Sequence, residues 1–256
     1  MKLRNIANAY FDETEGWASL VASYGAEVFQ ADRFVINDTA EGKVATFTVQ
    51  AGDVTSTAVV DGQTVIMAER SEVILGYWNT TKFKVVGAEE AVEYHRMTVK
   101  LHSPWTQPDA NAHGFHWGTL WQLHGPNNFI PGSPPMGLDV QEKYRLWMFG
   151  GDGTNGGYLD LSDSSLAVDT WVSWVIEVKW RFDNTGYVKL WRKNEGAAVW
   201  TEVAASYNIP TLAWRGVQSG YPHYTKCGYY RSASSHTNTV SHRKIIRTSK
   251  RALAFA

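Results

Sequence analysis

The chain has 256 residues, of which 44% are hydrophobic and 19% charged, so it can bury a large core and is expected to fold as one domain over residues 1–256. Its net charge of -1 argues against general nucleic-acid binding, which needs a basic field, but leaves room for a local basic cleft. A single cysteine excludes an internal disulfide, and no apolar run reaches the roughly 18–20 residues of a membrane helix. We therefore expect neither a nucleic-acid nor a membrane partner, and a monomer.

The first residues, MKLRNIANAYFDETEGW, contain charges but no apolar h-region. We therefore expect no secretory signal within this chain. A protein made without a signal, one whose signal has been removed, and a phage-associated protein are all consistent with this start, so the compartment stays open.

Hydrophobic and polar residues alternate along much of the chain, which is the pattern of half-buried strands, while helical periodicity is nearly absent. Turn signals such as VDGQ, GGDGTNGG and FDNTG separate the alternating segments. We predict an all-β fold, a concanavalin-like β-jelly-roll sandwich of two antiparallel sheets. The predicted strands span residues 44–53, 64–75, 93–102, 117–124, 144–151, 170–180, 186–193 and 224–231.

Three further expectations concern the segments between and after these strands. A short helix is predicted around residues 88–92, and long irregular stretches over 103–114 and 125–139. The C-terminal sequence HRKIIRTSKRALAFA is expected to give a last strand and then to fray.

Aromatic residues are unusually frequent, with 12 Trp, 12 Tyr and 10 Phe. A large β core with aromatic cross-strand pairs would explain them. A cleft in which Trp and Tyr faces stack on sugar rings would explain them equally well, and both can hold together.

The segment MAERSEVIL places Arg70 and Glu72 two residues apart on a predicted strand. Residues at i and i+2 share a face, so these two side chains should point the same way, with Ser71 and Val73 opposite. An Arg held by a neighbouring Glu suits the binding of a carboxylate or phosphate. A solvent-facing ion pair is the simpler alternative.

The segment WQLHG places Gln122 and His124 on one face, with Trp121 and Leu123 on the other. An amide beside an imidazole could neutralise a carboxylate and abstract a proton. A lone His is more often structural, but the upstream run HGFHW, which contains His116, adds polar and aromatic groups nearby.

The segment YTKCGYYR places Tyr224, Lys226, Gly228 and Tyr230 on one face of an extended strand, with Cys227 on the other. We expect Gly228 to leave a gap in which a ligand could approach the backbone. We also expect Lys226 to lower the pKa of Tyr230, because a positive neighbour favours phenolate. An aromatic-rich strand with a lysine that extends to solvent is the alternative.

These three segments resemble, in order and spacing, the jelly-roll polysaccharide lyases of the heparin-lyase-I-like group, which includes glucuronan lyases. Family 7 alginate lyases share the layout. The family pattern has R-x-E-L, Q-x-H and K-x-G-x-Y strands, which stand here as RSEV (70–73), QLH (122–124) and KCGYY (226–230). The resemblance covers about residues 40–235. It departs at a hairpin, where WRKNEG (191–196) replaces a W-x-N-G turn.

The resemblance implies an enzyme that cleaves a uronic-acid polysaccharide, such as glucuronan or alginate, by β-elimination. It assigns neutralisation of the substrate carboxylate to Gln122 with Arg70, and protonation of the departing O4 to Tyr230. For glucuronate or mannuronate, Tyr230 could be both base and acid, whereas for guluronate or iduronate His124 would be the base. The expected substrate-binding residues are Lys226, Glu72, His116 and Tyr224.

No cofactor is expected to be required, and no metal-binding residues are assigned. The glycine-rich run GGDGTNG (150–156) could hold a structural calcium ion, although it lacks the closing acidic residue of an EF-hand. A glycine-rich hairpin explains it more simply.

Other functions fit less well. A retaining glycoside hydrolase would need paired carboxylates, and no E-x-D-x-x-E run is present. A nucleophilic hydrolase is disfavoured by the absence of G-x-S-x-G. A noncatalytic carbohydrate-binding module or a phage receptor-binding β-sandwich remains the alternative.

Overall fold

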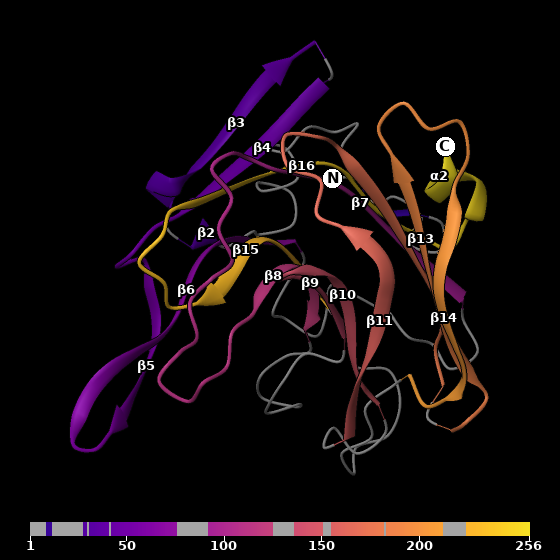
Figure 1. Cartoon of the computed structure of the whole chain (residues 1–256). Coiled ribbons are helices and arrows are strands. Elements are labelled where there is room, and N and C mark those ends of the chain that lie inside the picture. The colour runs from indigo at the N-terminus through magenta and orange to yellow at the C-terminus, as the bar shows by residue number, and fades with distance from the viewer. Residues whose placement is uncertain are drawn as a thin grey trace, which may run out of the picture.

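Alternating segments form strands throughout the computed structural model, and the strands build two antiparallel sheets (Figure 1). The structure describes residues 9–11, 28–29, 31–40, 42–75, 92–124, 136–150, 155–181, 183–211 and 224–256. The predicted all-β jelly-roll sandwich is confirmed, and each strand predicted from alternation is present within a few residues. The strands are β1 Ala9–Phe11, β2 Val28–Phe29, β3 Phe34–Thr39, β4 Gly42–Val49, β5 Val54–Val60, β6 Gln63–Leu75, β7 Val92–Leu101, β8 Gly118–His124, β9 Met136–Val140, β10 Lys143–Gly150, β11 Asn155–Ser165, β12 Val172–Lys179, β13 Gly186–Asn194, β14 Thr201–Ile209, β15 Tyr224–Ser232 and β16 Asn238–Thr248.

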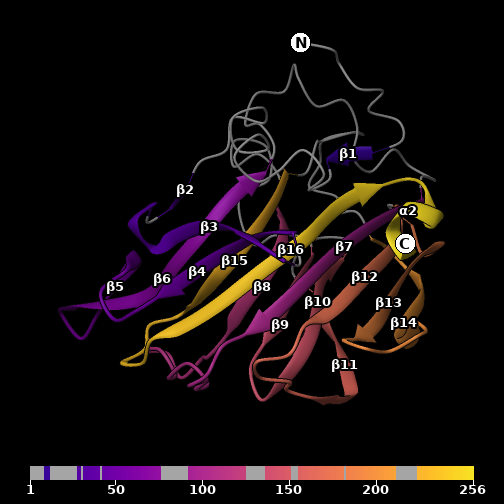
Figure 2. The same ribbon diagram turned by 90° about the horizontal axis from the view of Figure 1, so that it is seen from above.

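The two sheets are assembled from strands distant in sequence. Sheet A has the order β14-β13-β12-β7-β16-β4-β3, with β1 on β16. Sheet B has the order β11-β10-β9-β8-β15-β6-β2, with β5 on β6. Figure 2, viewed from above, shows how β15 passes between β6 and β8, so that three segments far apart in the chain become neighbours.

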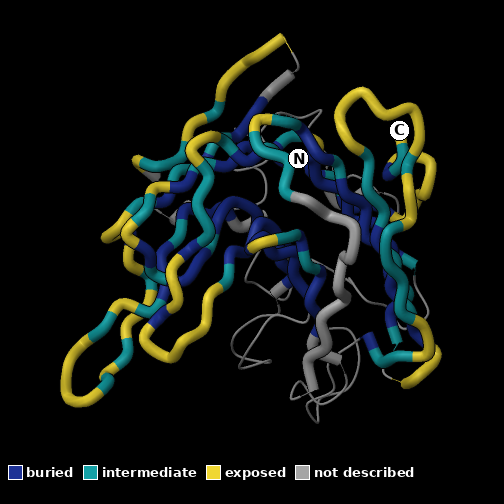
Figure 3. Tube along the Cα trace, viewed as in Figure 1, coloured by how far each residue is buried: buried dark blue, intermediate teal, exposed yellow. Residues whose placement is uncertain are grey.

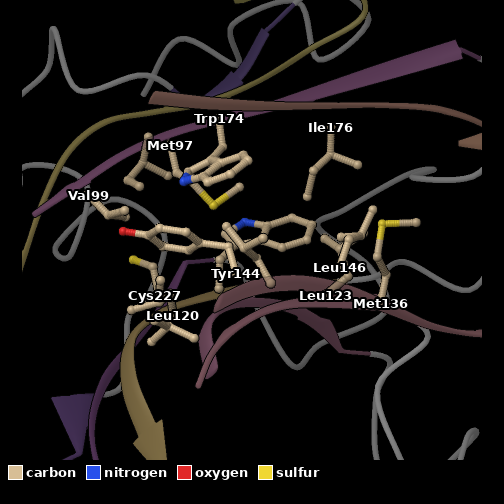
Figure 4. Packing of buried hydrophobic residues seen from close by; sticks show 14 of the residues in the cluster. Met97, Val99, Leu120, Leu123, Met136, Tyr144, Leu146, Trp174, Ile176 and Cys227 are labelled. Atoms are coloured by element: carbon tan, nitrogen blue, oxygen red, sulfur yellow. The ribbon is translucent and has the colours of Figure 1, made fainter. Parts of the chain in front are cut away.

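The core lies between the sheets and is filled by every second residue of the strands. Sheet A contributes Met97, Val99, Trp174 and Ile176, which meet Tyr144 and Leu146 of sheet B (Figure 4). The rings of Tyr144 and Trp174 have centroids 4.8 Å apart. Figure 3 shows that buried residues follow the facing strands of the sandwich, while the hairpin tips are exposed. Several of the abundant aromatic residues are therefore core residues.

Two expectations about irregular segments are wrong. Residues 136–139 belong to strand β9, because Met136 and Leu138 enter the core and the glycine between them makes room for an indole ring. The C-terminal residues do not fray, but form helix α2, Arg251–Phe255, whose Ala254 is buried and whose Phe255 packs against aromatic residues of sheet A.

The remaining expectations about segments have mixed outcomes. Residues 103–114 are irregular, as predicted. Of the helix predicted at 88–92, only Val92 is among the described residues, and it belongs to β7. In the described ranges, no helix is long and apolar enough to cross a membrane.

Candidate active site

The three predicted segments lie side by side in sheet B, as strands β6, β15 and β8. Lys226 of β15 is opposite Gln122 of β8, and Tyr230 of β15 is opposite Arg70 of β6. Their chain neighbours Val73, Trp121, Leu123, Cys227 and Tyr229 all belong to the core. Because successive side chains of a strand point to opposite faces, the candidate residues lie on the face of sheet B that is turned away from the core.

A buried carboxylate joins two of the strands at this face. Glu72 is fully buried, and its Oε1 accepts a hydrogen bond from Nε2 of Gln122 at 2.9 Å. Its Oε2 lies 3.5 Å from Nη1 of Arg70, whose side chain is 16% exposed. Glu72 therefore orients both groups to which the resemblance assigns neutralisation of the substrate carboxylate.

The ring of Tyr230 is held between a cation and an indole. The guanidinium carbon of Arg70 lies 4.7 Å from the ring centroid, and Trp117, in the segment before β8, makes an edge contact with centroids 5.9 Å apart. Burial raises the pKa of Tyr230, the positive charge of Arg70 lowers it, and the negative charges of Glu72 and Asp139 raise it further. The phenol thus stays protonated at neutral pH, as an acid must.

This result corrects the expectation that Lys226 lowers the pKa of Tyr230. The pKa is raised, and the cation that opposes the rise is Arg70. Lys226 lies four residues along the strand, at about 3.3 Å per residue, and is buried opposite Gln122. Its Cα is therefore paired with that of Gln122, whereas the Cα of Tyr230 is paired with those of Arg70 and Thr119.

Gly228 is needed for a different reason from the one expected. Its φ is +140°, and a Cβ there would lie 2.3 Å from the carbonyl oxygen of Ser71 and 2.7 Å from Cα of Glu72. Register shifts between Cys227 and Tyr230 mark a bulge at this position. The space beside Gly228 is occupied by β6 and Phe47, not left open for a ligand.

The other predicted site residues are placed less completely. The Cα of His124 is opposite that of Tyr224 at the ends of β8 and β15, but the side chains of both lie outside what the structure describes. His116 lies in the segment before β8, with an exposed side chain and a carbonyl that accepts a hydrogen bond from Gln141. No described contact links His116 to the cluster of Arg70 and Glu72.

A calcium site at 150–156 stays a prediction, because residues 151–154 lie outside the described ranges. Within those ranges, no group of three or more His, Cys, Asp or Glu side chains is arranged to hold a metal ion.

Two residues at this face were not predicted, Asp139 of β9 and Trp147 of β10. Both are buried, and Nε1 of Trp147 donates to Oδ1 of Asp139 at 2.7 Å. Little in the sequence pointed to Asp139, because β9 falls in a stretch interpreted as a loop. For Trp147 the alternation of YRLWMFG was the available signal.

The fold and this polar face define a jelly-roll protein of the kind found among polysaccharide-cleaving enzymes. The sequence matches the family model for polysaccharide lyases over residues 12–245. The chain belongs to this polysaccharide lyase family, and the predicted enzyme class is thereby confirmed over the noncatalytic alternatives. Comparison with curated proteins finds no match.

Solved structures with the same fold include several lyases. The endo-β-1,4-glucuronan lyase of the fungus Trichoderma reesei is 16% identical, with a TM-score of 0.60 over 90% of this chain and 92% of that one. The PL-14 alginate lyase of Aplysia kurodai is 10% identical, with a TM-score of 0.57 over 90% of this chain and 93% of that one. A mutant of the alginate lyase Aly36B, in complex with alginate trisaccharide, is 11% identical, with a TM-score of 0.57 over 98% and 97% of the two chains. At these identities the likeness shows the shared fold.

Proposed function

We propose that this lyase cleaves a uronic-acid polysaccharide by β-elimination, with Tyr230 as the acid that protonates the departing O4. The observation that carries the proposal is the continuous contact from Tyr230 through Arg70 and Glu72 to Gln122. It joins a protonated phenol to an amide and a guanidinium on one face of the sheet.

The chemistry requires these groups because the C5 proton of a uronate is too weakly acidic while the carboxylate at C6 keeps its full charge. An amide N–H and a guanidinium that bind the carboxylate stabilise the enolate-like intermediate formed when that proton leaves. Gln122 donates one N–H to Glu72 and so presents its remaining donor in a defined direction.

The charge of the site also suits an anionic sugar. This face carries the cations Arg70, Lys226 and Arg145 against the carboxyl groups of Glu72 and Asp139, so cations are in the majority even when Asp139 is ionised. Arg70, Lys226 and Glu72 have little solvent exposure, so their charges act with less screening than surface charges would.

The base depends on the epimer. In glucuronate and mannuronate, H5 and O4 lie on the same side of the ring, so the phenolate form of Tyr230 can take H5 and the phenol formed in that step can give the same proton to O4. Because the raised pKa of Tyr230 keeps the phenolate scarce at neutral pH, this route should speed up as the pH rises. In guluronate and iduronate they lie on opposite sides, and we assign the base to His124. Glucuronan and alginate are the first polymers to test, because proteins of the same fold are lyases of these two polymers.

A panel of glucuronan, alginate blocks, hyaluronan and heparin tests the proposal. The purified chain should release oligosaccharides that absorb in the band of unsaturated uronates and that are lighter by one water than hydrolysis products. Saturated products from every cleaved polymer would show hydrolysis and reject elimination.

A further inference from the structure

Asp139 is a buried carboxyl group that the proposed reaction does not use. Its neighbours Leu138 and Val140 enter the core, so Asp139 points to the face that carries Gln122. Its side chain is buried, with residue exposure of 3%, and it lies between β8 and β10 with Thr119 and Arg145 as Cα partners. Carboxylates are rarely buried unless they have a task or a set of partners.

Asp139 lies in the same row of the sheet as the proposed acid. Thr119, its partner on β8, is also the partner of Tyr230 on β15. Asp139 and Tyr230 are therefore two strand spacings apart, roughly 10 Å. This is close enough for the charge of Asp139 to raise the pKa of Tyr230.

Asp139 also fixes the position of an indole. It accepts the Nε1 hydrogen of Trp147 at 2.7 Å, and both side chains are nearly out of solvent. The indole lies on Gly137, where a Cβ would approach ring atoms Cζ2 and Cε2 to 2.4 Å and 2.5 Å. Gly137 is the Cα partner of Gln122, so the contact with Gly137 holds the indole over the strand next to Gln122.

We propose that Asp139 is a positioning residue for sugar binding, which holds Trp147 on Gly137 as a wall of the subsite beside Gln122. Trp147 is only 9% exposed, so it acts as an apolar wall against one side of the sugar rather than as an open stacking platform. This inference rests on the proposed uronate substrate. It also gives Asp139 a second effect, because the carboxylate, when ionised, repels the anionic sugar.

The protonation of Asp139 makes the inference testable. Burial raises the pKa of Asp139 to about 6, against hydrogen bonds from Thr119 and Trp147 and the charge of Arg145. Among the described residues, the phenols of Tyr229 and Tyr230 also interact with the charge of Asp139. Above pH 6 the ionised carboxylate repels a uronate, so affinity should fall as the pH rises through this value.

The experiment measures the dissociation constants of glucuronan and alginate at pH 5 to 8. A Tyr230→Phe background prevents cleavage during binding. Asp139→Asn keeps an oxygen that accepts the indole N–H, so its affinity at pH 5 should stay within about twofold of the parent, and the loss of affinity towards pH 8 should be clearly smaller than in the parent. Asp139→Leu removes the acceptor, so Trp147 is no longer held in place and binding should weaken about tenfold at pH 5, which corresponds to about 1.4 kcal/mol.

Trp147→Phe removes the indole N–H that Asp139 accepts, and Gly137→Ala places a Cβ against the indole ring. Both substitutions should weaken binding about tenfold. If Asp139→Leu does not fold, the Asn variant and its pH profile decide. Unchanged affinity in Trp147→Phe, or a pH dependence as large in Asp139→Asn as in the parent, overturns the inference.

The outcome separates the two proposals. A chain that binds a uronate polymer with the expected pH dependence, but in its native form releases no unsaturated product, refutes the elimination and keeps the function of Asp139. A chain that binds none of these polymers overturns both.

Discussion

Replacing Glu72 by Gln should disturb both stability and catalysis, because Glu72 is the buried connection between Gln122 and Arg70. The amide has one oxygen where the carboxylate has two. If that oxygen faces Nε2 of Gln122, the new NH₂ group faces the guanidinium, and if it faces Arg70, two NH₂ groups meet. Each orientation keeps one acceptor, and neither keeps both the 2.9 Å contact to Gln122 and the 3.5 Å contact to Arg70.

The cost follows from these contacts. A hydrogen bond between a charged and a neutral group contributes about 1.5–3 kcal/mol. The longer contact to the partly exposed Arg70 adds little more, since solvent screens it. We expect a loss of about 2–3 kcal/mol, or roughly 4–12 °C in Tm for a chain of this size. Because Gln122 keeps at best a weaker, neutral acceptor and Arg70 loses its carboxylate partner, kcat should fall about tenfold or more.

Thermal unfolding by circular dichroism and initial rates at 25 °C measure the two effects. Glu202→Gln is the matched control, because Glu202 lies 3.8 Å from Lys189 in a more exposed pair whose loss should cost less than about 1 kcal/mol. If Glu72→Gln matches this control in Tm and retains kcat within twofold, Glu72 does not organise the site.

Three other substitutions test separate parts of the account. Gly228→Ala should lower the free energy of unfolding by about 2 kcal/mol or more and reduce activity, because its Cβ would push the backbone of β6. Gly62→Ala is the control, since Gly62 also has a positive φ but nothing lies within 4 Å of its Cβ position, and it should lose less stability in the same unfolding assay. His124→Asn should leave measurable activity on a glucuronate or mannuronate polymer and abolish activity on a guluronate or iduronate polymer. We favour the first kind of substrate. Full activity of His124→Asn on every cleaved polymer would show that His124 is structural. Burial lowers the pKa of the buried His242 to about 4. Between pH 6.5 and 4 the unfolded chain therefore takes up a proton at this residue that the folded chain does not. The free energy of unfolding should fall by about 3 kcal/mol as the pH drops over that range. The raised pKa of Asp139 has the opposite effect, because it makes the folded chain more stable as the pH falls. The effect of His242 is therefore isolated by subtracting the unfolding free energy of His242→Gln from that of the native chain at each pH. If the two chains show the same dependence of stability on pH, His242 does not contribute to it.

Local patterns were sufficient to predict the strands that build the site. Alternation in MAERSEVIL, WQLHG and YTKCGYYR puts Arg70, Gln122 and Tyr230 on the polar face of their strands, and the core on the other side confirms this. What alternation cannot give is the register between strands. The opposition of Lys226 to Gln122, and of Tyr230 to Arg70, is set by pairing with two distant strands, and the bulge at Gly228 shifts the register of β15 against β8 but not against β6.

The electrostatic detail was beyond the sequence for the same reason. Lys226 is nearer to Tyr230 in the chain, but Arg70 is the cation that contacts the ring. Asp139 was missed because the proline and glycine residues before it suggested a loop, although Met136 and Leu138 alternate as a strand requires. Asp139 is buried because β9 lies between β8 and β10, and local sequence patterns do not predict which strands are neighbours in a sheet.

Tyr230 is proposed above as the acid of a β-elimination. A comparison of the native chain with Tyr230→Phe on the polymer cleaved fastest tests this role, by following the absorbance of unsaturated uronate ends. Tyr207→Phe, a phenol exposed on β14, is the matched control. If Tyr230 transfers this proton, Tyr230→Phe should lower kcat about 100-fold or more with little change in polymer affinity, while the control retains full activity. A Tyr230→Phe enzyme that forms unsaturated product at most of the native rate would show that another group is the acid.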